Sequence, residues 1–266
     1  GYPVPEFDFR VPGVTSISAD LHKYGYAAKG ASVILYRDRT LRRYQMFAYT
    51  DWPGGIYASP TMAGTRPGGA IAAAWAVMRH LGEEGYTQIA AEVMEAVRRL
   101  QEGIAAIDGV HVLGAPDMSV MAIASDTLDV YQIGDEMGLR GWHLDRQQAP
   151  ASLHMTVHRG HVDVVDDFLR DLADSVAAVK RPTPRRLGTG FLMWLVQVVA
   201  RILPERWLSW LTARVSGLLG GGGELPKRSA ALYGMMGTLP NRGDLKELVL
   251  DLVEGFTDPR QSSQGE

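Results

Sequence analysis

The sequence predicts an α/β fold, on three observations. Residues 14–18 and 31–36 have the small, β-branched and apolar composition of strands. Residues 70–107 have the composition and apolar spacing of helices. From 110 to 179, short apolar segments alternate with helical patterns, which is typical of a small α/β unit.

The first two predicted strands flank a polar segment. VTSIS at 14–18 and ASVILY at 31–36 have the composition of buried strands. Between them, residues 20–26 (DLHKYGY) carry more functional groups than a simple turn requires. We therefore expect a functional site between these strands.

A glycine-rich segment follows at 54–69 (GGIYASPTMAGTRPGG). It contains five glycines and three serine or threonine residues, a composition typical of a loop. The alanine-rich residues 70–81 predict a helix. A loop rich in backbone NH groups therefore precedes a helix start.

The second half of the chain begins with another helical pattern. Over 84–107, apolar residues recur at helical spacing between charges, at Ile89, Val93, Val97, Leu100 and Ile104. After this helix we predict strands at 110–113, 118–124 and 152–157, with helices at about 128–138 and 161–179. A domain boundary within 90–105 gives two domains, residues 1–95 and 96–266.

Residues 181–227 differ in composition and have the character of an insertion. The apolar run at 191–200 is too short to span a bilayer, because charged residues interrupt its surroundings. Two interpretations remain open. An apolar helical stripe is more often protein core or a subunit contact, whereas Trp194, Trp207 and Trp210 also suit a peripheral membrane contact through 187–219.

Composition argues against several functions. The net charge of -3 and pI of about 6.2 give no basic footprint for nucleic acid. Without cysteine, the chain has no disulfides, thiolate metal sites or thiol nucleophile. His158 and His161 lack an accompanying carboxylate motif, so we expect surface positions and no metal. The chain opens at Gly1 without a leader, and we expect a fragment of a cytoplasmic protein.

Lys23 is the residue most suited to covalent chemistry. A lysine that follows a buried strand can be desolvated, so that its neutral amine becomes accessible to a carbonyl group. His22 precedes it, and Lys29 and Ser32 follow closely. Two cations and several hydrogen-bond donors at this spacing suit a phosphate dianion.

These residues carry a specific resemblance. The runs VTSISADLHKYGYAAKGASVILY and GGIYASPTMAGTRPGG resemble the sphingosine-1-phosphate lyase branch of the group II pyridoxal-phosphate-dependent decarboxylases. The similarity continues through YQIGDEMGLRGWHLDRQQAPASLHMTV and resumes at RSAALYGMMGTLPNRGDLKELVLDLVEGF. It implies the aminotransferase-like α/β fold (fold type I), with the end of a large cofactor domain followed by a small C-terminal α/β domain.

The resemblance also implies roles for individual residues. Lys23 corresponds to the lysine that forms the Schiff base with pyridoxal 5'-phosphate, and His22 to the histidine beside that cofactor. Thr65 corresponds to the hydroxyl residue that reaches the cofactor phosphate of the neighbouring protomer, which implies a homodimer. Lys29 corresponds to a lysine near the substrate phosphate, and Tyr57 lies in the same matched loop as Thr65.

The residue at position 154 bears on the reaction. Related decarboxylases of free amino acids have an arginine in this strand, which pairs with the substrate carboxylate, whereas this chain has His154. The resemblance therefore implies cleavage of a phosphorylated long-chain base to a fatty aldehyde and phosphoethanolamine. His154 either contacts the substrate or only packs within its strand.

Two alternatives remain: an amino-acid decarboxylase that uses the same lysine, and an inactive fragment of either enzyme. In the family, the residues that pair with the pyridine nitrogen and stack on the cofactor ring lie upstream of the matched region. The chain alone is therefore expected to be incomplete as an enzyme.

Overall fold

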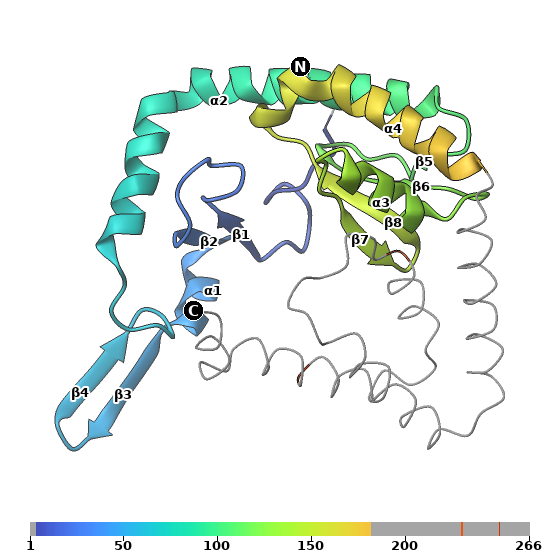
Figure 1. Cartoon of the computed structure of the whole chain (residues 1–266). Helices are drawn as coiled ribbons and strands as arrows, with labels where there is room; N and C mark the ends of the chain where they lie inside the picture. The colour runs from blue at the N-terminus through green and yellow to red at the C-terminus, as the bar shows by residue number, and fades with distance from the viewer. Residues whose placement is uncertain (1–3, 182–229, 231–249, 251–266) are drawn as a thin grey trace, which may run out of the picture. The chain divides into compact units, whose positions relative to one another are not determined.

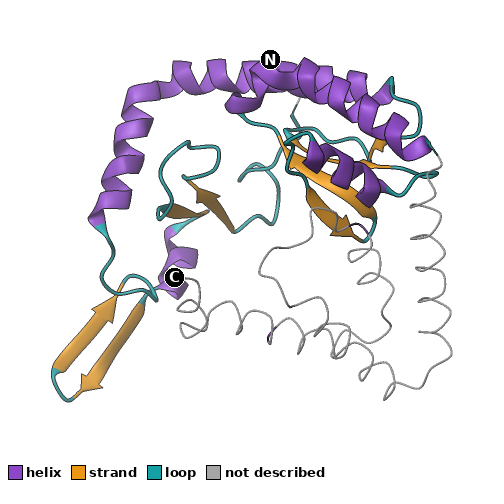
Figure 2. Cartoon of the chain, viewed as in Figure 1, coloured by secondary structure: helices purple, strands orange, loops and turns teal. Residues whose placement is uncertain are grey.

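A computed structural model describes residues 4–181, together with Ala230 and Leu250 (Figure 1). The predicted insertion at 181–227 and its membrane contact at 187–219 therefore lie outside the described residues, apart from Arg181. Among the described helices, none is long and apolar enough to cross a bilayer. Helices and strands alternate along the described chain (Figure 2), which confirms the α/β class.

The described residues form two compact units, which divide between Glu92 and Val93. One helix, α2 (Gly68–Ala105), contributes residues to both units. Assignment of the units to the end of a cofactor domain and to a small C-terminal domain stays a prediction.

The first unit begins with an antiparallel pair of strands, β1 (Ser16–Asp20) and β2 (Ser32–Tyr36). Both strands lie where the sequence predicts them, within two residues. The prediction that they are buried is wrong for this chain, since most of their residues are exposed. Among the described residues, no third strand joins this pair.

A short helical segment and a hairpin follow. Asp38 caps α1 (Arg39–Arg42), and a 3-10 turn, η1 (Arg43–Gln45), leads into the hairpin. Its strands are β3 (Phe47–Trp52) and β4 (Gly55–Ser59). The prediction of a loop over 54–69 is therefore wrong at 55–59, because pairing with the aromatic strand β3 outweighs the glycine content.

The long helix α2 (Gly68–Ala105) joins the two helices predicted at 70–81 and 84–107. Gly82 interrupts it with φ 60° and ψ -176°, a left-handed backbone that favours glycine. The helical pattern is thus continuous in sequence while the helix is kinked, as the bend of α2 in Figure 1 shows.

The second unit contains a four-stranded antiparallel sheet of order β5-β6-β8-β7. Its strands are β5 (His111–Val112), β6 (Val120–Ala124), β7 (Asp145–Gln148) and β8 (Ala151–Thr156). Its helical elements are the end of α2 from Val93 to Ala105, α3 (Val130–Leu139), the 3-10 helix η2 (Arg159–Val164) and α4 (Val165–Lys180). The core includes fully buried Ile104, Ile123, Ile133, Leu153 and Leu172.

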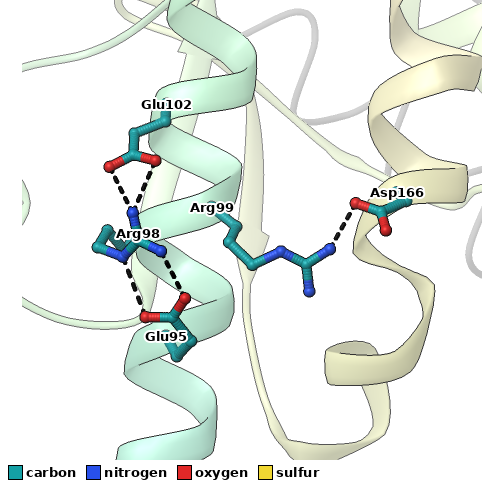
Figure 3. Close-up of polar contacts among 5 residues, drawn as sticks. All are labelled: Glu95, Arg98, Arg99, Glu102 and Asp166. Carbon is teal, nitrogen blue, oxygen red and sulfur yellow. Dashed lines mark hydrogen bonds and ion pairs between the residues drawn. The ribbon is translucent and has the colours of Figure 1, made fainter.

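Ion pairs mark the surface of α2 in this unit (Figure 3). Arg98 lies between Glu95 and Glu102, three and four residues away on the same helix. Arg99 instead reaches Asp166 at the start of α4. Such exposed pairs contribute little to stability, so the apolar core holds α2 and α4 together.

A buried ion pair joins α3 to β7. The Arg146 guanidinium lies 2.7 Å from Oδ1 of Asp135, and both side chains are largely buried. The other oxygen of Asp135 accepts a hydrogen bond from the backbone N–H of Ala230, at 3.1 Å. Arg146 also lines a cavity of about 430 Å³ beside α3, with Trp142 and His143.

Candidate active site

The loop between β1 and β2, residues 21–31, is called here the lysine loop. Backbone hydrogen bonds define its shape, including Leu21 N–H to the Ala31 carbonyl (3.2 Å) and Ala27 N–H to the Leu21 carbonyl (3.0 Å). A turn closes beside Lys23, whose N–H donates to the Asp20 carbonyl at 3.0 Å. The loop is therefore a defined structure that positions its side chains.

One hydrogen bond and one steric restriction further define the lysine loop. The Tyr86 hydroxyl on α2 donates to the Gly25 carbonyl at 2.8 Å. A Cβ at Gly25 would lie 2.4 Å from the Leu21 carbonyl oxygen, so this position requires glycine. The loop is thus anchored to a helix of its own unit and tolerates no side chain at that point.

Asp20 lies at the centre of the polar contacts. Nζ of Lys23 is 3.0 Å from Oδ2 of Asp20, and the Ser32 hydroxyl donates to Oδ1 at 2.6 Å. The hydrogen bond from Ser32, followed by that from Lys23, lowers the pKa of Asp20 below its ordinary value of 3.8. The carboxylate is therefore charged at neutral pH and faces the lysine amine.

His22 lies beside this pair, with Nε2 4.0 Å from Oδ2 of Asp20. Its Nδ1 is buried and has no hydrogen-bond partner among the described residues. A buried polar atom without a partner costs free energy, so Nδ1 suits a hydrogen bond to a bound ligand.

The other predicted site residues of this unit lie apart from that cluster. Lys29 is exposed in the lysine loop. Tyr57 lies on β4, opposite Tyr49 and 6.1 Å from the ring of Phe47, while exposed Thr65 lies between β4 and α2. Within the described residues, no hydrogen bond or ion pair joins any of the three to Lys23. Their roles stay predictions.

His154 belongs to the second unit. It lies on β8 opposite Asp145 of β7, with 3.7 Å between Nδ1 and Oδ2 of that aspartate. Asp145 is therefore a partner of His154 within the sheet. Such a contact is compatible with the interpretation that His154 only packs within its strand. A role at the substrate stays a prediction.

His158 and His161 act as a reciprocal helix cap. Nδ1 of His158 accepts from Gly160 N–H, and Nδ1 of His161 accepts from His158 N–H, each at 3.1 Å. The sequence predicted only surface positions for these two histidines, and this capping role was not predicted. The spacing of a capping box would have indicated it, although histidine is unusual there.

Asp20 lies in the polar segment that the sequence predicts as a site, but its contact with Lys23 was not predicted, and Tyr86 was not among the predicted site residues. The three-residue spacing from Asp20 to Lys23 was a usable signal, because a turn brings such residues together. Tyr86 gave no such signal, since 61 residues separate it from Gly25.

Comparison with known proteins adds to this geometry. No family model matches the chain. The chain is similar to sphingosine-1-phosphate lyase of Arabidopsis thaliana, 42% identical over 255 residues, which cover 96% of this chain and 40% of the relative. It is also 43% identical over 201 residues to sphingosine-1-phosphate lyase 1 of Rattus norvegicus, which cover 74% and 35%. The chain thus spans 40% or less of these relatives.

Solved structures agree with the sequence relatives. The sphingosine-1-phosphate lyase of Burkholderia pseudomallei has a TM-score of 0.65 and 43% identity, covering 74% of this chain and 44% of that chain. Glutamate decarboxylase of Lactobacillus brevis has a TM-score of 0.54 at 18% identity, covering 66% and 43%, and shows the fold alone. These neighbours confirm the aminotransferase-like fold type I predicted from the sequence.

Proposed function

The chain belongs to the sphingosine-1-phosphate lyase family, and on that premise we propose that it supplies the lysine-bearing part of a pyridoxal-phosphate-dependent carbon–carbon lyase. The substrate is a phosphorylated long-chain base, and the products are a fatty aldehyde and phosphoethanolamine. The observation that carries the proposal is the lysine loop, where the Lys23 amine lies 3.0 Å from Oδ2 of Asp20 and Nε2 of His22 lies 4.0 Å from the same oxygen. Nδ1 of His22 is buried and has no hydrogen-bond partner among the described residues.

Residues of the lysine loop, together with Thr65, have the chemistry that pyridoxal phosphate requires. Lys23 offers the amine for covalent attachment, and Nδ1 of His22 offers a buried hydrogen-bonding atom. Lys29 and Thr65 offer an ammonium and a hydroxyl for phosphate groups. When bound, the cofactor accepts the electron pair left at the cleaved carbon–carbon bond.

The chain's own residues bind, orient and transfer protons. Nζ of Lys23 would hold the cofactor covalently, and its free amine would take up or release a proton at the reacting centre. Lys29 binds the substrate phosphate. His154 stands where related decarboxylases have an arginine, so no guanidinium is available there to pair with an α-carboxylate. The lyase reaction therefore has more support than decarboxylation of a free amino acid.

A cofactor-trapping experiment tests this function. The chain is joined to the remaining segments of a relative, loaded with pyridoxal phosphate and reduced with borohydride. We expect the cofactor on the peptide that contains Lys23, and aldehyde formation from sphingosine-1-phosphate. Lys23→Ala should abolish the trapping and lower the rate of aldehyde formation by about a thousandfold or more.

Lys180→Ala is the matched control for this experiment. Lys180 pairs with Asp108 in the second unit, so its loss removes one ammonium and leaves the lysine loop unchanged. It should keep both trapping and activity. Trapped cofactor that persists at equal yield in Lys23→Ala would refute the assignment of Lys23.

A further inference from the structure

The position of Asp20 follows from the register of β1 and β2. Asp20 is the last residue of β1 and pairs with Ser32, the first residue of β2. Directly opposed residues of an antiparallel pair bring their side chains close together. The Ser32 hydroxyl therefore reaches Oδ1 of Asp20 and leaves Oδ2 directed at the lysine loop.

The turn that follows β1 returns Lys23 to the same carboxylate. The Lys23 N–H donates to the Asp20 carbonyl, and Nζ of Lys23 lies 3.0 Å from Oδ2. The backbone and the side chain of Lys23 are thus both tied to one residue. His22 lies between Asp20 and Lys23 in the sequence, and its Nε2 is 4.0 Å from Oδ2 of Asp20.

We propose that Asp20, oriented by Ser32, is the positioning residue that holds the Lys23 amine and the His22 imidazole in register for the cofactor. The proposal rests on the proposed function and names a residue that acts through Lys23. An ordinary surface ion pair holds neither partner, because both side chains rotate. Here the hydroxyl of a neighbouring strand fixes one oxygen of the carboxylate. A turn fixes the backbone of Lys23 so that its amine reaches Oδ2, although the side chain is 66% exposed.

The test measures the chemical reactivity of Lys23 in the 266-residue chain without cofactor. Trace acetylation with acetic anhydride, followed by peptide mass spectrometry, gives the rate at Lys23 relative to Lys29. Asp20→Asn removes the carboxylate charge, so the Lys23 amine should react about two- to fivefold faster. Asp20→Glu should return the ratio toward that of the original chain.

Two further variants separate a local effect from a general one. Ser32→Ala keeps both charges and releases the carboxylate, so a smaller rise in the Lys23 ratio is expected. Asp51→Asn on β3 makes the same charge change away from the lysine loop and should leave the ratio unchanged. The proposal is overturned if Asp20→Asn and Asp51→Asn give the same ratio, or if Lys29 accelerates as much as Lys23.

Failure of this proposal and failure of the proposed function give different results. If the assembled enzyme traps no pyridoxal phosphate at Lys23, the function is wrong, and the acetylation ratio still decides the role of Asp20. If trapping succeeds and the acetylation ratio does not respond to Asp20→Asn, the positioning role alone is wrong.

Discussion

Gly134 on α3 illustrates how single residues limit the packing of the second unit. A Cβ at this position would lie 2.8 Å from Cδ2 of Leu153 on β8. Leu153 is fully buried and cannot move aside easily. The helix therefore approaches the sheet closely because this residue has no side chain.

We predict that Gly134→Ala destabilises the protein by about 1–3 kcal/mol, because the added methyl group overpacks the core. Urea-induced unfolding measures the change in free energy. Gly138→Ala is the control on the same helix, since nothing lies within 4 Å of its Cβ position. That variant should gain up to about 1 kcal/mol, because alanine favours a helix. Equal effects of the two substitutions would contradict the packing argument.

At the level of elements, the start of η2 depends on two neutral histidines. Nδ1 of His158 and Nδ1 of His161 each accept a backbone hydrogen bond, and protonation removes that ability. Burial, followed by the charge of His158, lowers the pKa of His161 below its ordinary value of 6.5. The Arg159–Asp163 ion pair lies on the same 3-10 helix.

The sign of the pH dependence follows from this shift. The unfolded chain takes up a proton near pH 6.5, whereas folded His161 does so only at lower pH. The stabilisation by this cap should be complete above pH 6.5 and decline as the pH falls. Loss of a cap costs about 0.5–2 kcal/mol.

His161→Gln tests this element, because glutamine accepts the same hydrogen bond without titrating. Thermal unfolding of the variant should depend less on pH than that of the original chain below pH 6.5. His80→Gln removes an exposed histidine on α2, outside the cap, and should keep the original pH dependence. An unchanged pH dependence in His161→Gln would exclude the cap as its source.

At the scale of the whole molecule, the first unit exposes large apolar side chains. Trp75 on α2 is 67% exposed and Ile56 on β4 is 81% exposed, and Trp52 and Tyr57 of the same hairpin are also exposed. Large exposed apolar patches are typical of interaction surfaces. These side chains are therefore candidates for contact with another protein surface.

We predict that the assembled enzyme is a homodimer whose sites use Lys23 of one protomer and Thr65 of the other. Mixing Lys23→Ala with Thr65→Asp should restore activity, because each mixed dimer contains one site with both residues intact. Mixing Lys23→Ala with Lys23→Arg is the control and should restore none. Full activity in a species that sediments as a monomer would contradict the dimer.

The sequence by itself determined the local elements and the family. Helical spacing and alanine content located α2 and α4 within a few residues, since these signals act between neighbours along the chain. The runs around Lys23 also predicted the strands beside it and the fold type that the structural neighbours confirm.

Tertiary structure decided which strands pair and which side chains meet. It made β4 from a glycine-rich segment and β7 from the polar residues 145–148, because hydrogen bonds to the adjacent hairpin strand stabilise both. It also paired β6 with β8, which α3 and β7 separate in the sequence. It placed Ser32 against Asp20, which a linear pattern could not reveal across twelve residues. Strand pairing depends on partners remote in sequence, whereas helix formation depends mainly on local contacts, and this difference separates what could be predicted from what could not.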